Sequence, residues 1–295
     1  MKTKTAMITI AGRPNVGKST LTNYLVGEKI AIVSNKPQTT RNRICGIVTR
    51  GNIQFVFVDT PGFHCARTKL GDYMVNVAQE SIADVDLTIL VVEPIASVGT
   101  QEEGLLQWIQ SSHCPAVLAI NKIDTVEKDK LLEVIAAYSQ KADFDAIVPI
   151  SAKTGDGVDD LLKTCEKYAV EGPFLFPEDV TTDQPERQVM AEIIREKLLW
   201  CLEREVPHGT AVEITKFSER DNGIIDIDAT IYCEKASHKG IIIGKGGEML
   251  KKISSLARAD CEKFMGTKVY LTTWVKVKEN WRDSDFLVRN FGYSE

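Results

Sequence analysis

The sequence predicts two domains: an α/β domain with a mostly parallel sheet and helices on both faces, followed by an α+β domain. The first follows from short apolar runs that alternate with helix-compatible stretches, and from polar or glycine-rich turns placed directly after the apolar runs. The second follows from a change in order beyond a proline-containing segment, where a helix, two strands, a helix and a strand succeed one another.

We expect the first domain to span residues 1–171. Its strand-like runs are 6–11, 53–58, 86–92, 116–120 and 146–150. Its helix-compatible stretches are 19–26, 70–83, 101–110, 129–140 and 158–169. Because a helix between two strands forms a crossover connection, this alternation predicts that the neighbouring strands are parallel.

Residues 172–183 are rich in proline and in acidic or hydroxyl residues, and we interpret them as a linker. The second domain then covers residues 184–295. Its predicted elements are a helix at 185–205, strands at 210–217 and 223–233, a helix at 248–264 and a strand at 268–277. A chain of 295 residues, 43% of them hydrophobic, is long enough to bury two cores.

Composition excludes several classes of protein. The net charge of −5 argues against a surface coated throughout by nucleic acid, although it permits a local basic face. The seven cysteines are scattered singly, which fits a reducing compartment better than a disulfide framework or a zinc site. The chain begins without a secretory signal pattern, and its apolar runs stay short of the roughly 20 residues that cross a membrane.

The strongest chemical signal is Gly-Arg-Pro-Asn-Val-Gly-Lys-Ser at residues 12–19, which fits the pattern GxxxxGK[ST] between a strand and a helix. In such a loop, backbone N–H groups converge on phosphate oxygens; Lys18 would reach the β- and γ-phosphates, and Ser19 would bind Mg²⁺. A chance match is on the order of 1 in 100 for such a chain. The expected nucleotide-binding residues here are Gly12, Arg13, Pro14, Asn15, Val16, Gly17, Lys18, Ser19 and Thr20.

A second motif, Asp59-Thr60-Pro61-Gly62, directly follows the run 53–58. An aspartate at the carboxyl end of a strand can hold a metal-bound water, and the N–H of Gly62 can donate to a γ-phosphate. By itself this tetrapeptide would more often be only a turn. Together with the glycine-rich loop it predicts a site for a nucleoside triphosphate and Mg²⁺.

The base is predicted from Asn121-Lys122-Ile123-Asp124, which follows the run 116–120. The Asp124 carboxylate can accept from N1–H and the 2-amino group of guanine together, whereas adenine has an acceptor at N1 and no amino group there. Buried oxygens left without a donor penalise the wrong base, so GTP and GDP are the expected ligands. Ser151-Ala152-Lys153, after the run 146–150, is where a backbone N–H would meet guanine O6.

The second domain carries Gly244-Lys245-Gly246-Gly247 ahead of its second helix. Two glycines at this spacing occur by chance about once in a chain of this length, so the context decides. A KH module holds about four nucleotides of single-stranded RNA at such a turn. Residues 239–278 contain nine basic and three acidic residues, although an ordinary helix with solvated lysines stays the alternative. The expected RNA-binding residues are Ile243, Gly244, Lys245, Gly246, Gly247 and Lys251.

The ordered motifs of residues 1–170 resemble the TRAFAC GTPases, and Pro37-Gln38-Thr39-Thr40-Arg41 resembles switch I of the Era family. The similarity extends through Asp183-Gln184-Pro185-Glu186-Arg187 to Trp281-Arg282. It implies a P-loop GTPase domain followed by a type II KH domain. It also implies binding to the 3′ end of small-subunit (16S) ribosomal RNA, a role in assembly of the 30S subunit, and a cytoplasmic location with peripheral contact at the inner membrane face. We expect a monomer.

In that family a switch I threonine completes the Mg²⁺ shell, which assigns Thr40, with Thr39 as the alternative, to the metal beside Ser19 and Asp59. Many small GTPases place a water-orienting glutamine directly after Asp-x-x-Gly, but this chain has Phe63, which cannot hydrogen-bond to water. The resemblance suggests that Asn15 instead coordinates K⁺, with slow intrinsic hydrolysis. The expected catalytic residues are Lys18, Asn15, Thr40 and Gly62. His64 and Arg67 are left out because a solvated loop explains them better.

Two other functions stay open. One is an RNA-binding protein whose nucleotide is structural and is not hydrolysed. The other is a TRAFAC GTPase that acts on a different RNA, although members that act in tRNA modification or large-subunit assembly carry other appended modules in place of a C-terminal KH domain.

Overall fold

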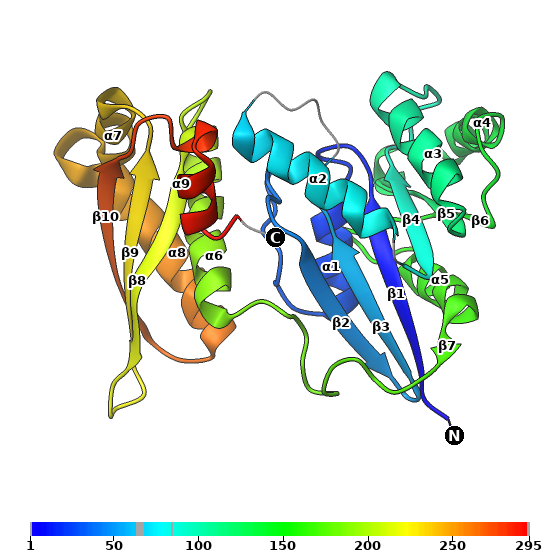
Figure 1. Ribbon diagram of the computed structural model, residues 1–295, viewed down its shortest axis with the longest axis horizontal. Coiled ribbons are helices and arrows are strands. Elements are labelled where there is room, and N and C mark those ends of the chain that lie inside the picture. The colour runs from blue at the N-terminus through cyan, green and yellow to red at the C-terminus, as the bar shows by residue number, and fades with distance from the viewer. Residues whose placement is uncertain (1, 63–67, 84, 294–295) are drawn as a thin grey trace. The chain divides into compact units, whose positions relative to one another are not determined.

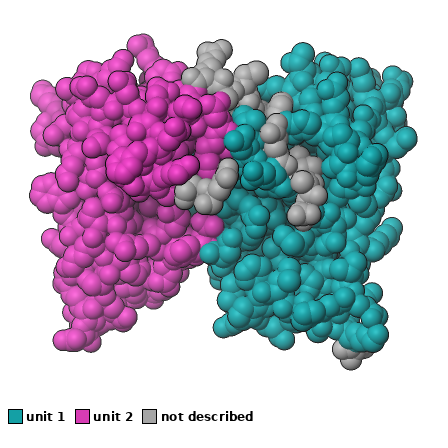
Figure 2. Space-filling model, viewed as in Figure 1, with its two compact units in different colours: residues 1–31, 40–66, 74–183 teal, residues 32–39, 67–73, 184–295 magenta. Residues whose placement is uncertain are grey.

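The computed structural model describes residues 2–62, 68–83 and 85–293 (Figure 1). The chain divides into two compact units, one of residues 1–31, 40–66 and 74–183 and one of residues 32–39, 67–73 and 184–295 (Figure 2). The predicted fold class is confirmed, because an α/β unit with a mostly parallel sheet is followed by an α+β unit. Within the described part of the chain, no helix is both long and apolar enough to cross a membrane.

The sheet of the first unit has the strand order β2-β3-β1-β4-β5-β6, with β7 paired to β1. Its parallel strands are β1 (Lys4–Ala11), β3 (Ile53–Asp59), β4 (Leu87–Val92), β5 (Ala116–Ile120) and β6 (Ala146–Pro149). Two strands are antiparallel to their neighbours: β2 (Ile44–Arg50) and β7 (Val170–Glu171). These two were not predicted. Gly46 interrupts the apolar pattern of β2, and the structure explains it, since a Cβ there would lie 2.8 Å from Val26 Cγ2.

Helices cover both faces of this sheet. On one face, α1 (Lys18–Val26) and α5 (Val158–Cys165) bury their leucines against alternate residues of β1. On the other face, α3 (Thr100–Ser112) and α4 (Lys128–Ser139) pack on β4 and β5. α2 (Lys69–Ala83) also contacts β1, because the Thr9 hydroxyl donates to Ser81 O. Each parallel strand is therefore covered by apolar side chains on both sides, which accounts for the unbroken apolar runs in the sequence.

Residues 172–183 lie along the sheet of the first unit, and we call them the strap. The fully buried side chain of Gln54 holds the first part: Oε1 accepts from Leu175 N at 2.9 Å and Phe176 N at 3.0 Å. Its Nε2 donates to Phe176 O at 2.9 Å. One buried glutamine thus satisfies three backbone groups of a segment that has no regular secondary structure.

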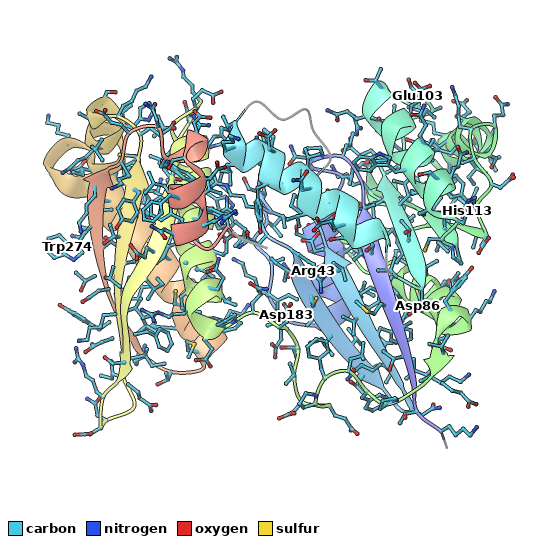
Figure 3. The ribbon with its side chains drawn as sticks, viewed as in Figure 1. Arg43, Asp86, Glu103, His113, Asp183 and Trp274 are labelled. Carbon is cyan, nitrogen blue, oxygen red and sulfur yellow. The ribbon has the colours of Figure 1, made fainter. Side chains whose placement is uncertain are left out.

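The second part of the strap runs along the outer edge of β2. Ile47 N donates to Thr181 O at 2.9 Å, and Cys45 N donates to Asp183 Oδ1 at 3.0 Å. Figure 3 shows Arg43 and Asp183 on this edge. Burial, reinforced by the charge of Asp183, raises the pKa of the Cys45 thiol to about 12, so the thiol stays protonated. The strap therefore covers backbone groups that an edge strand would otherwise expose.

The second unit contains a sheet of strand order β10-β9-β8. β8 (Ala211–Glu219) is antiparallel to β9 (Ile225–Cys233), which pairs in parallel with β10 (Val269–Val277). Its helices are α6 (Glu186–Cys201), α7 (Ala236–Ile243), α8 (Glu248–Met265) and α9 (Asp285–Asn290). α6, α7 and α8 share one apolar core with the strands. The sequence did not predict α7 or α9, each of which is under nine residues long.

Residues 32–39 belong to the second unit because α6 holds them. Val33 N donates to Glu196 Oε1, and Trp200 Nε1 donates to Val33 O, each at 2.9 Å. Arg195, Glu196 and Lys197 follow one another on α6 and are at most 1% exposed. Lys197 pairs with Glu196 at 2.7 Å, so the buried charges are compensated.

The strap gives a stability prediction. Gln54→Leu removes the acceptor and donor that Leu175 and Phe176 use, and leaving buried polar groups without partners should lower the free energy of unfolding by about 2 kcal/mol. Urea denaturation measures this loss, and faster hydrogen exchange at the two strap amides should accompany it. The matched change Gln110→Leu removes only an exposed bond to Lys141 O and should stay within about 0.5 kcal/mol of the wild type. Equal stabilities of the two variants would contradict this role of Gln54.

Candidate functional site

Residues 12–17 form a loop between β1 and α1, and Lys18 and Ser19 begin α1. The shape of the loop depends on two glycines. A Cβ on Gly12 would lie 2.5 Å from Val91 O, and a Cβ on Gly17, whose φ is +104°, would lie 2.2 Å from Asn121 Nδ2. The Lys18 side chain folds back over the loop, where Nζ donates to Gly12 O and Arg13 O at 3.0 Å. This is the loop geometry that presents an ammonium and consecutive N–H groups to a phosphate.

Lys18 and Asp59 are buried beside each other, with 6% and 0% of their surface exposed. Burial lowers the pKa of Lys18 to about 8, and the charge of Asp59 offsets part of that effect. Burial also raises the pKa of Asp59, although Lys18 and the hydroxyl of Ser19 act in the opposite direction. Burial thus disfavours the charged form of both side chains. A bound phosphate or metal ion of opposite charge would favour the charged forms again, as is common at binding sites.

Three oxygen-bearing side chains meet at the carboxyl end of β3. Ser19 Oγ donates to Asp59 Oδ2 at 2.7 Å and lies 2.9 Å from Thr40 Oγ1. Thr40 Oγ1 is 3.4 Å from the same carboxylate oxygen. The other oxygen, Asp59 Oδ1, is buried without a hydrogen-bond partner among the described residues. A free carboxylate oxygen beside two hydroxyls fits the oxygen ligands that Mg²⁺ prefers.

The adjacent threonine lies elsewhere. The Thr39 hydroxyl donates to Lys36 O at 2.7 Å, whereas Thr40 reaches both Ser19 and Asp59. Of the two candidates that the sequence left open, Thr40 is therefore the one that lies beside the other predicted metal ligands.

The tetrapeptide at residues 59–62 approaches the phosphate loop. The Thr60 hydroxyl donates to Ile10 O at 3.1 Å, and Pro61 is buried. A Cβ on Gly62 would lie 2.8 Å from Pro14 N, so the close approach of the two loops requires glycine here. Residues 63–67, which include Phe63, His64 and Arg67 from the sequence argument, lie outside the described residues.

The side chain of Asn121 joins three loops. Its Nδ2 donates to Val16 O at 2.7 Å, and its Oδ1 accepts from Ala152 N at 2.9 Å. Close by, Ser151 Oγ donates to Asp124 Oδ1 at 2.8 Å and so orients the carboxylate predicted to read guanine. The remaining predicted residues are less constrained: Lys153 is exposed, and Thr20 is half-buried in the first turn of α1.

In the second unit, four of the six predicted RNA-binding residues, Gly244 to Gly247, form a turn between α7 and α8. Gly244 has φ +75° and ψ 175°, and a Cβ there would lie 2.7 Å from Met249 Cβ. Lys245 and Gly246 are exposed at the tip, and Gly247 precedes the N-terminus of α8. Ile243 packs against the core, and Lys251 is exposed on α8. The turn thus presents a lysine and a helix N-terminus, which both favour a phosphate.

Sequence reasoning missed two acidic residues beside the phosphate loop. Glu93 follows β4, and its Oε2 accepts from an Arg13 guanidinium nitrogen at 2.6 Å. Glu102, on the first turn of α3 and 4% exposed, has Oε1 at 2.8 Å from Arg13 Nε. Neither residue belongs to a recognised motif. The available signal for Glu93 was its position directly after a buried apolar strand, at the sheet edge where the other site residues lie.

The lowered pKa of Lys18 predicts proton uptake on binding. At pH 8.5 most of the free protein carries neutral Lys18, whereas bound phosphates favour the ammonium. Binding of GDP without Mg²⁺ should therefore be accompanied by uptake of about 0.7 proton by Lys18. At pH 7.0 Lys18 is already protonated, and the uptake should fall to about 0.1. Calorimetry in buffers of different ionisation enthalpy measures both values. Lys18→Arg should abolish the uptake, because arginine keeps its proton at both pH values; equal uptake at the two pH values would contradict the assignment.

Family models match two parts of the chain: residues 7–122 match a family described as 50S ribosome-binding GTPase, and residues 205–282 match the KH domain. The GTPase Era of Ruminiclostridium cellulolyticum is 53% identical over 293 residues, which cover 99% of this chain and 98% of that protein. The GTPase Era of Clostridium kluyveri is 51% identical over 290 residues, which cover 98% and 99%.

Solved structures agree with this similarity over both units. The crystal structure of a single-residue variant of Aquifex aeolicus Era bound to GDP·AlF₄⁻ has a TM-score of 0.95 and 38% identity, and the match covers 99% of this chain and 100% of that chain. A structure of Era with MgGDPNP and a fragment of 16S ribosomal RNA has the same TM-score and identity. The chain therefore belongs to the Era family of GTPases.

Proposed function

We propose that this GTPase is a switch that binds the 3′ end of small-subunit ribosomal RNA and acts in assembly of the 30S subunit. The observation that carries the proposal is that one chain joins the nucleotide loop of the first unit to an exposed glycine-lysine turn at the N-terminus of α8 in the second. The solved relative supports it, because that Era is in complex with MgGDPNP and nucleotides 1506–1542 of 16S ribosomal RNA.

The nucleotide site that we propose follows the geometry of the first unit. Lys18 and the N–H of Gly62 would bind the phosphates, and Asp124 would accept from guanine. Asn15 and Thr40 complete the catalytic set, and Ser19, Thr40 and Asp59 would hold Mg²⁺. When bound, Mg²⁺ neutralises charge that develops on the phosphate oxygens during transfer to water. The rest of the site comprises Gly12, Arg13, Pro14, Val16, Gly17, Thr20, Thr60, Pro61, Asn121, Lys122, Ser151, Ala152 and Lys153.

The proposed domain limits are 1–171 for the GTPase domain, 172–183 for the connection and 184–295 for the KH domain. The hydrogen bonds of the strap with Gln54 and β2 support treating residues 172–183 as a segment that stays with the GTPase domain. A monomer in the cytoplasm, with peripheral contact at the inner membrane face, belongs to the same proposal and rests on the family resemblance alone.

The RNA site is tested by changing the tip of the turn. Lys245→Asp with Gly246→Asp puts two carboxylates where phosphate would bind. A Cβ at Gly246 meets nothing within 4 Å, but the φ of +60° there strains a side chain, although aspartate tolerates this region better than most residues. Binding to a 16S 3′-end RNA should weaken at least tenfold, as expected when like charges oppose phosphate, with GTP affinity unchanged. Fluorescence anisotropy with the full chain measures both.

The matched control is Lys130→Asp, which makes a similar charge change at an exposed position of α4. It should leave RNA binding within about twofold of the wild type. Unchanged RNA binding in the turn variant would refute the site. Binding of the 16S fragment no tighter than an unrelated RNA would favour the alternative of a GTPase that acts on a different RNA.

The ion dependence of hydrolysis is tested at Asn15. If its side chain coordinates K⁺, turnover in KCl should exceed turnover in NaCl at equal ionic strength several-fold, because the ion supplies positive charge beside the phosphates. Asn15 has φ +66°, so Asn15→Ala strains the backbone whereas Asn15→Gly does not. Both variants should lose the difference between the salts. Retention of the difference in Asn15→Gly would exclude the amide as the ligand, and absence of single-turnover hydrolysis in either salt would favour a structural nucleotide.

A further inference from the structure

Glu93 contacts the phosphate loop and the guanine-reading segment at the same time. Its Oε2 accepts from Arg13 at 2.6 Å, and its Oε1 pairs with Lys122 Nζ. Lys122 Nζ also donates to Asn15 O at 2.8 Å, within the phosphate loop. Arg13 in turn reaches the nearly buried Glu102 on α3. The Glu93 carboxylate therefore links Arg13, 80 positions before it in the chain, with Lys122, 29 positions after it.

The placement of Glu93 is rigid. It directly follows the fully buried strand β4, whose last residue accepts from Asn121 N at 2.8 Å through Val92 O. The Glu93 side chain is 26% exposed, so its charge is only partly screened by water. Without it, the cations of Arg13 and Lys122 would approach each other with no carboxylate between them, and Lys122 would lose one of the two contacts that hold it against Asn15.

We propose that Glu93 is a positioning residue for guanine nucleotide binding. By binding Arg13 and Lys122 together, it couples the phosphate loop to the segment that reads the base. The distance between the phosphate-binding and the base-binding residues is thereby fixed. Glu93 acts through these residues and does not itself touch the nucleotide. The inference rests on the nucleotide site proposed above.

The coupling is tested with Glu93→Gln in the full chain, which keeps the shape and removes the charge. Affinity for GDP should fall about tenfold, which lies within the usual range of coupling free energies between two binding regions. IDP lacks the 2-amino group of guanine, from which Asp124 would accept a hydrogen bond. The ratio of the affinities for GDP and IDP therefore reports how well that carboxylate is placed. This preference should shrink about threefold. The KM for GTP should rise while kcat at saturation changes less than about twofold, because Glu93 does not touch the reacting atoms.

The matched control is Glu103→Gln, the same chemical change at the position next to Glu102 on α3 (Figure 3). Glu103 pairs with Lys141 at 2.9 Å, but both side chains are about half exposed, so its loss should alter neither GDP affinity nor the preference over IDP. Glu93→Asp keeps the charge on a shorter side chain and should restore part of the affinity. Arg13→Gln combined with Glu93→Gln should cost less than the sum of the two single changes.

Two results would overturn the inference. One is wild-type affinity and preference in Glu93→Gln. The other is a lower melting temperature with an unchanged preference for GDP over IDP, which would make the residue structural only. Lys18→Ala tests the nucleotide site independently of the role of Glu93. Unchanged GDP binding in Lys18→Ala would refute the proposed nucleotide loop, whereas weakened binding would leave only the positioning role of Glu93 in question.

Discussion

The arrangement of the nucleotide site depends on one side-chain amide, that of Asn121. Its nitrogen donates to Val16 O and its oxygen accepts from Ala152 N. The three segments follow β1, β5 and β6, and β4 lies between β1 and β5, so no backbone ladder joins the phosphate loop to the base-reading segment directly. The amide makes the buried connection, and Lys122 Nζ, which donates to Asn15 O, makes a second one nearer the surface. The amide also explains Gly17, because Asn121 Nδ2 occupies the space that any larger residue would need.

The sequence predicts buried strands best and exposed or edge elements least. β5 was predicted with both of its limits, since a strand covered on two faces is a continuous apolar run with polar ends. β2 was missed because Gly46, Thr49 and Arg50 dilute its pattern. Arg195, Glu196 and Lys197 look like a solvated turn of a helix. They are buried instead, because their partners come from residues 32–39 and from Asp260. Such partners are invisible to local patterns.

The site divides in the same way. Three motifs of the site are each an unbroken stretch of sequence: the glycine-rich loop, residues 59–62 and residues 121–124. Their backbone requirements restrict the residue types at fixed positions, so they can be recognised in the sequence. Thr39 and Thr40 are chemically equivalent in the sequence, and only the direction of each side chain separates them. Glu93 belongs to no motif, and its position after a buried strand becomes informative only once Arg13 and Lys122 are seen around it.

The strap also shows that a proline-containing segment between two domains can be ordered along its length. A flexible segment of twelve residues has an average end-to-end distance of roughly 20 Å. The strap is instead bonded to Gln54 and to the edge of β2 up to Asp183, so its length does not add to the reach of the connection. The conformational entropy of these residues is therefore lost when the first unit folds, and not when a ligand binds.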